Sequence, residues 1–172
     1  GFQNKKWDKR WRVVVFDVEE TNKQTRERFR SKLKELGFGM LQESVFISPY
    51  DIARDFAEFI ESQGLTESTY LLEVSSIAVG DIKALVNRVW QLDKINDLYR
   101  KIIGIIEENH LISDRGRLNK LNDEDIKKVE GLNREIKKAY LEVILEDPLL
   151  PKELLPLDWE GERARHLVKK II

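Results

Sequence analysis

The chain has 172 residues, of which 41% are hydrophobic and 35% are charged, enough for an apolar core beneath a well-solvated surface. The formal net charge is -1, so contact with nucleic acid would require a local basic patch. The lack of cysteine excludes disulfides, zinc–thiolate sites and thiol nucleophiles, and the two distant histidines argue against a metal–histidine cluster or a Ser-His-Asp triad.

The first predicted element is a buried strand. Residues 12–18 read RVVVFDV, a β-branched and aromatic run typical of a strand in a core. Thr21 and Gln24 then have the spacing of a capping box, which predicts a helix from about residue 22. Gly37 is the natural residue to end that helix.

A second strand–helix–strand stretch follows. Residues 39–48 predict an extended segment, either one strand or two short strands with a kink. Ser48 and the proline after it indicate the start of a second helix, which stops at Gly64. Residues 69–76 predict another strand.

From Gly80 onward the pattern becomes helical. Asp81 is placed to cap a helix, and further helical segments end in a long helix over residues 123–146. The apolar residues of this long helix step by three and four: Val129, Leu132, Ile136, Ala139 and Val143. Such a stripe predicts a core face, and dimerisation through it is an alternative.

The tail contains three prolines within nine residues, which predicts an extended, ordered loop before a last helix near residues 162–172. We therefore expect an α+β domain over residues 1–91, followed by an α-helical C-terminal subdomain over residues 92–172. No apolar run is long enough to span a bilayer and no signal-peptide pattern opens the chain, so we expect a cytoplasmic protein that does not engage membranes.

Asp17 is the strongest candidate in the sequence for a catalytic or metal-binding residue. It lies at the carboxyl end of the predicted first strand, where open α/β sites collect functional groups. Two copies of Asp17 in a dimer could hold a divalent cation, with Glu19 and Glu20 in the same turn. Structural carboxylates outnumber catalytic ones, which favours a capping role or an arginine pair instead.

The helix after the first strand carries a basic stripe. Lys23, Arg26, Arg30 and Lys34 recur at helical spacing and could follow a phosphate backbone. The alternative is a solvated helix face, which is more common. Trp7 and Trp11 are interleaved with lysines and arginines at the N-terminus, and their spacing favours an anchor that packs on the domain.

Two stretches resemble the PaaX family of transcriptional repressors. The first reads WDKRWRVVVFDVEE and continues as RERFRSKLKELGFGMLQESVFISPYD, similar to the middle region of that family. The second is the tail DPLLPKELLPLDWEG, which resembles the family's C-terminal signature. The matching residues of the tail are Asp147, Pro148, Leu150, Pro151, Glu153, Leu154, Leu155, Pro156, Asp158, Trp159 and Gly161.

The resemblance implies a homodimeric repressor body that senses an effector. Founding members of the family respond to phenylacetyl-coenzyme A, so an aryl- or acyl-coenzyme A is the implied effector, with binding residues that the resemblance does not identify. The family reads DNA with a winged helix-turn-helix domain, for which there is no room before Trp7. We therefore expect that domain upstream of these residues or on another chain.

The first half also resembles the CRISPR-associated Cas-two family. The shared pattern is VVVFDV, a basic helix, and a second strand region with Gln42, Ser44, Val45 and Phe46. This resemblance implies a ferredoxin-like fold that dimerises through its sheet. It also implies an alternative function: a nuclease using Mg²⁺ or Mn²⁺ at Asp17, or a non-catalytic platform for nucleic acid. We favour the regulator without a cofactor, and whether the chain is an enzyme stays open.

Overall fold

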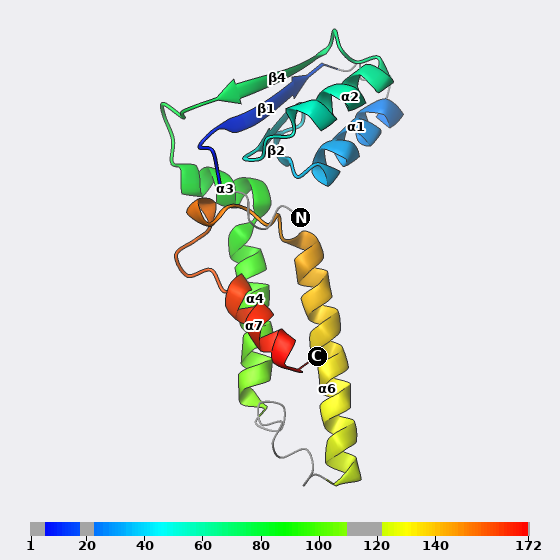
Figure 1. Ribbon diagram of the computed structural model, residues 1–172, viewed down its shortest axis with the longest axis vertical. Coiled ribbons are helices and arrows are strands. Elements are labelled where there is room, and N and C mark those ends of the chain that lie inside the picture. The colour runs from blue at the N-terminus through cyan, green and yellow to red at the C-terminus, as the bar shows by residue number, and fades with distance from the viewer. Residues whose placement is uncertain (1–5, 18–22, 110–121, 172) are drawn as a thin grey trace. The chain divides into compact units, whose positions relative to one another are not determined.

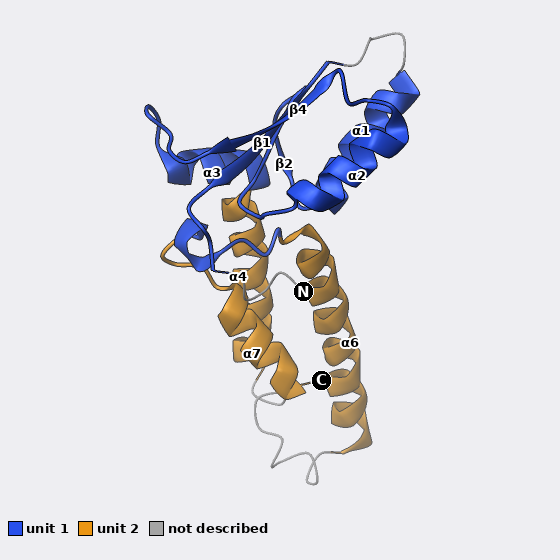
Figure 2. Cartoon of the chain, turned by 45° about the horizontal axis from the view of Figure 1, so that its top comes forward, with its two compact units in different colours: residues 1–90, 148–155 blue, residues 91–147, 156–172 orange. Residues whose placement is uncertain are grey.

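The computed structural model describes residues 6–17, 23–109 and 122–171. The chain forms two compact units, coloured separately in Figure 2. Unit 1 comprises Gly1–Trp90 and Pro148–Leu155, and unit 2 comprises Gln91–Asp147 and Pro156–Ile172. The proline-rich tail is therefore divided, because its first part belongs to unit 1 and its second part to unit 2.

Unit 1 has the ferredoxin-like arrangement expected from the sequence (Figure 1). Its antiparallel sheet has the strand order β2-β3-β1-β4. The elements in chain order are β1 (Trp11–Phe16), α1 (Lys23–Glu35), β2 (Gly39–Gln42), β3 (Val45–Ser48), α2 (Ala53–Gln63), β4 (Thr69–Val74) and α3 (Ile82–Trp90). The segment predicted as one or two strands forms two, with a turn between them.

The core of unit 1 lies between one face of the sheet and helices α1 and α2. Val14 and Phe16 of β1 point into it because alternate residues of a strand face the same side. Phe29 of α1 and Phe56 of α2 meet them there, and the ring centroids of Phe16 and Phe29 are 4.5 Å apart. We call this side of the sheet the core face.

Helix α2 begins later than the sequence indicates, at Ala53 rather than near Ser48. Ser48 is instead the last residue of β3, where it lies opposite Arg12 of β1 and is fully buried. Its hydroxyl accepts a hydrogen bond from the backbone N–H of Tyr50 at 3.2 Å. Pairing with β1 keeps this residue extended and overrides the local signal for a helix start.

Two glycines follow α1. One forms the turn that ends the helix, and the other lets helix α3 approach strand β2 closely. Gly37 has a φ of +84° directly after the helix, as predicted for a terminating glycine. Gly39 opens β2, and a Cβ atom there would lie 2.1 Å from a methyl carbon of Val89 on α3. Helix α3 therefore packs directly on β2, on the side of the sheet opposite the core face.

Unit 2 is helical, as expected for the C-terminal subdomain. Its helices are α4 (Leu92–Glu108), α6 (Asp123–Glu146) and α7 (Gly161–Ile171). Of the predicted stripe on α6, Val129, Ile136 and Val143 are buried, while Leu132 and Ala139 are half-buried. Tyr140 completes the buried face of α6.

The tail is ordered by its apolar side chains, as predicted. Leu150 and Leu154 are buried, the second of them in the short 3-10 helix η2 (Lys152–Leu154) of unit 1. The tyrosine hydroxyl of Tyr50 donates a hydrogen bond to the carbonyl oxygen of Leu149 within the same unit. In unit 2 the ring of Trp159 packs edge-on against Tyr99, with centroids 5.6 Å apart.

Candidate functional site

The open face of the sheet in unit 1 is the face opposite the core face. Trp11, Val13 and Val15 of β1 alternate onto it, and the strand register places Ile47 of β3 and Leu72 of β4 on either side of Val13. An apolar sheet face without full cover is unusual in a water-soluble domain and marks a surface for a ligand or partner.

A cavity of about 300 Å³ lies on this open face. The sheet supplies its floor, and the segment after β4 and helix α3 supply its walls. Most of the lining residues are apolar, and two are charged. The complete lining consists of Trp11, Val13, Leu41, Ile47, Val74, Ile77, Val79, Gly80, Asp81, Leu85 and Arg88. Apolar cavities with a few charged groups at the edge are the usual form of small-molecule sites.

Trp11 of β1 lines the cavity, and two other tryptophans pack against its ring. The ring of Trp11 is 3% exposed and stacks on that of Trp90, with centroids 6.4 Å apart and planes 21° from parallel. Trp7 contacts the edge of Trp11 at a centroid distance of 5.2 Å. The two N-terminal tryptophans therefore act as the packing anchor that the sequence favours.

The two charged residues of the cavity differ in what they contact. The carboxylate of Asp81 accepts a hydrogen bond from the backbone N–H of Ala84 at 2.7 Å and so caps α3, as predicted. The guanidinium of Arg88 is exposed, and within the described part of the chain no hydrogen bond or ion pair engages it. A positive charge is therefore available at the cavity.

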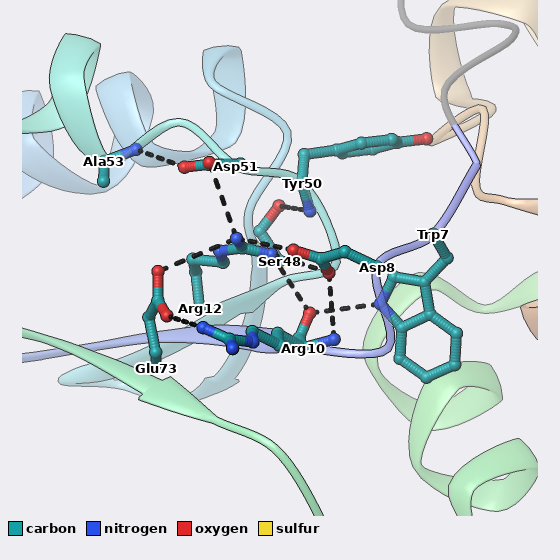
Figure 3. Close-up of polar contacts among 9 residues, drawn as sticks. All are labelled: Trp7, Asp8, Arg10, Arg12, Ser48, Tyr50, Asp51, Ala53 and Glu73. Carbon is teal, nitrogen blue, oxygen red and sulfur yellow. Dashed lines mark hydrogen bonds and ion pairs between the residues drawn. The ribbon is translucent and has the colours of Figure 1, made fainter.

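Away from the cavity lining, a cluster of charged residues surrounds Arg12, whose side chain is only 3% exposed. Its guanidinium lies 2.7 Å from a carboxylate oxygen of Asp8, 3.6 Å from one of Asp51 and 3.7 Å from one of Glu73. Figure 3 shows these carboxylates converging on it from the N-terminal segment, the segment that precedes α2, and strand β4. Arg10 adds an ion pair with Glu73 at 2.8 Å.

The Arg12 cluster fastens the N-terminal segment to the sheet. The hydrogen bond from Arg12 lowers the pKa of Asp8 below the ordinary aspartate value, because it stabilises the ionised carboxylate. The same bond raises the pKa of Arg12. With three carboxylates around one buried cation, the cluster offers no anion site, and its role is structural.

Asp17 lies at the carboxyl end of β1, as predicted, and is exposed. Its backbone N–H donates to the carbonyl oxygen of Ser68 at 2.8 Å. Glu19 and Glu20 lie outside the described residues. Among the residues that are described, no group of three or more histidine, cysteine, aspartate or glutamate side chains could hold a metal ion. The metal role of Asp17 stays a prediction.

The basic stripe on α1 is partly neutralised within the unit. Arg26 and Arg30 each lie 3.6 Å from the carboxylate of Glu43 in the turn between β2 and β3. The Arg30 side chain also donates to the Glu43 carbonyl oxygen at 3.2 Å. Lys23 and Lys34 are exposed. Binding of nucleic acid by the four residues stays a prediction, and the ion pairs reduce the charge that two of them can offer.

Polar residues of unit 2 hold the second part of the tail. Asn96 is 3% exposed, and it donates to the Asp158 carbonyl oxygen at 3.0 Å and accepts from the Glu160 N–H at 2.8 Å. The Tyr99 hydroxyl donates to the carboxylate of Asp147 at 2.7 Å, and burial raises the pKa of Tyr99. Asp147 thus contributes its carboxylate and Asp158 its backbone carbonyl, and both contacts are structural.

Sequence reasoning missed the cavity and the cluster around Arg12. The cavity depends on α3 reaching across to β2, which the residue pattern does not indicate. The position of Arg12 inside the β-branched run of the first strand was the available signal, because a charge in such a run needs buried partners.

None of the helices in the described residues combines the length and apolarity that a membrane crossing requires.

Comparisons with known proteins agree across both units. The family model of the PaaX protein central Cas2-like domain matches residues 4–86, and that of the PaaX-like protein C-terminal domain matches residues 90–172. The transcriptional repressor PaaX of Escherichia coli (strain K12) is 26% identical over 171 residues. That alignment covers 94% of this chain and 50% of the repressor, so the chain spans half the length of this relative.

A solved structure shares the fold. It is the uncharacterized protein Rv0674 from Mycobacterium tuberculosis, which superposes with a TM-score of 0.63 at 20% identity and covers 98% of this chain and 61% of that chain. At this identity the likeness concerns the fold alone. The two family models, by contrast, together match nearly every residue in sequence order, and on that ground the chain belongs to the PaaX family.

Proposed function

We propose that this chain is the dimerising and effector-sensing body of a PaaX-type transcriptional repressor. The proposal rests on the match of this chain to both PaaX family models, in sequence order. The alignment with the E. coli repressor likewise extends across both units. DNA would be read by a winged helix-turn-helix domain, either upstream of these residues or on another chain.

The sheet of unit 1 offers a surface for pairing with a second copy. Strand β4 is at the edge of the sheet, and its open-face side chains Tyr70 and Leu72 are 61% and 48% exposed. An unprotected edge strand with large apolar side chains tends to associate with another chain. The family resemblance favours a second copy of this chain as that partner.

Replacing Leu72 with glutamate should therefore dissociate the homodimer. The introduced charge would be buried at the contact without a partner, which should raise the dissociation constant about thirtyfold or more. Sedimentation velocity over a range of protein concentrations measures this directly. The matched control is Leu157→Glu, because Leu157 is a leucine with 97% exposure in unit 2. A wild-type chain that is monomeric throughout would contradict the dimer.

The effector part of the proposal is tested with a panel of acyl-coenzyme A compounds, aryl ones included. A ligand that binds only the folded chain, present at about a hundred times its dissociation constant, should raise the melting temperature by about 5 °C or more. Coenzyme A without an acyl group is the control. If no compound in the panel shifts the melting temperature beyond this control, acyl-coenzyme A sensing is excluded while dimerisation remains.

A further inference from the structure

We propose that the cavity on the open face is a binding site for a small apolar group that carries an anionic substituent. An aromatic group or a branched chain would occupy the apolar interior, and a carboxylate, sulfonate or phosphate would pair with Arg88. The identification of such a ligand as the effector rests on the function proposed above, whereas the binding chemistry rests on the cavity alone.

The cavity is suited to a small apolar group. At about 300 Å³ it lies at the lower end of the range of small-molecule pockets, which run from roughly 300 to 1,000 Å³. Its floor comes from Val13 and Ile47, which are held opposite one another by the pairing of β1 and β3. Leu85 of α3 faces this floor from the wall.

The cavity is also formed before any ligand arrives. Trp11 is held between Trp7 and Trp90 and is almost fully buried, so its ring is fixed in place. The contact of Gly39 with Val89 and Trp90 fixes α3 against the sheet. A preformed apolar site binds without the cost of ordering its own side chains.

The charges decide which apolar ligand fits. Asp81 is engaged at the N-terminus of α3, where the helix dipole and the Ala84 N–H offset its negative charge. Arg88 has no comparable partner in the described residues. Because the available charge is positive, an anionic substituent is favoured over a neutral or cationic one.

The test uses two fluorescent probes that differ by one charged group. 1-Anilinonaphthalene-8-sulfonate is an aromatic anion, and N-phenyl-1-naphthylamine has the same rings without the sulfonate. We expect both to bind the full chain with enhanced fluorescence. Arg88→Gln should weaken binding of the anion about tenfold and leave binding of the neutral probe unchanged, because only the anion uses the guanidinium.

The matched control is Lys83→Gln, which removes an exposed charge from the same helix outside the cavity lining. It should change the affinity of either probe less than twofold. Leu85→Phe should weaken both probes, because the larger ring fills the cavity. Circular dichroism spectra and a cooperative melting transition confirm that each variant is folded, since these dyes also bind partly unfolded chains.

Equal weakening of the anion by Arg88→Gln and Lys83→Gln would overturn the proposal, because it would reduce the effect to net charge. Unchanged binding of both probes to folded Leu85→Phe would overturn it as well. If Leu85→Phe dissociates a dimer without changing either affinity, a second copy occupies the cavity and the ligand site is excluded. If the probes bind specifically but no acyl-coenzyme A stabilises the chain, the ligand site is supported and only the proposed effector class is excluded.

Discussion

Phe29→Ala should lower the free energy of unfolding by about 3–5 kcal/mol, the range for truncating a fully buried phenylalanine. Phe29 is 1% exposed and lies at the centre of the unit 1 core. Its ring contacts Phe16 with centroids 4.5 Å apart, Phe59 at 5.7 Å and Phe56 at 6.3 Å. The substitution removes three ring contacts at once and leaves a cavity that both helices and the sheet would have to close.

Urea unfolding followed by far-UV circular dichroism measures the effect. The control is Arg28→Ala, an exposed neighbour on the same helix, which should change the free energy of unfolding by less than about 0.5 kcal/mol. A small loss for Phe29→Ala, comparable to that of the control, would mean that α1 does not pack on the sheet as described.

The position of Phe29 was predictable because it follows from periodicity. Phe29 and Leu33 are four residues apart on one helix face, and Gly37 marks the end of that helix in the sequence as in the structure. The strand order is likewise what the resemblance to ferredoxin-like families implies. Features that depend on local pattern and on a known arrangement of strands were accessible from the sequence.

Features that depend on contacts between distant segments could not be predicted from the sequence. Glu43 lies in a turn, and nothing in the sequence shows that it folds back onto Arg26 and Arg30. The cavity likewise needs Arg88 and Leu85 of α3 to come beside the first strand. A basic stripe therefore suggested a nucleic-acid surface on α1, whereas the arginine that lines the cavity, Arg88, lies on α3.

Arg12→Met should lower the free energy of unfolding at neutral pH by about 2–3 kcal/mol, at or below the lower end of the range for breaking a buried ion pair. Methionine retains much of the side-chain volume but leaves Asp8, Asp51 and Glu73 without their shared cation. The loss stays moderate because these carboxylates are 44–68% exposed and water can solvate them. Arg10→Met is the control, because its ion pair with Glu73 is exposed and should contribute less than about 1 kcal/mol.

The pH dependence separates charge pairing from packing. Asp8 has a lower pKa in the folded chain than in the unfolded chain, so its interaction with Arg12 stabilises the fold above the unfolded pKa of about 4. That stabilisation is lost as the pH falls through the folded pKa, where the Asp8 carboxylate takes up a proton. The gap in stability between wild type and Arg12→Met should therefore be widest above pH 5 and should narrow toward pH 3. Urea titrations at pH 3, 4, 5 and 7 provide the comparison, and a gap of constant size would mean that ionisation of the carboxylates contributes nothing to the stabilisation by Arg12.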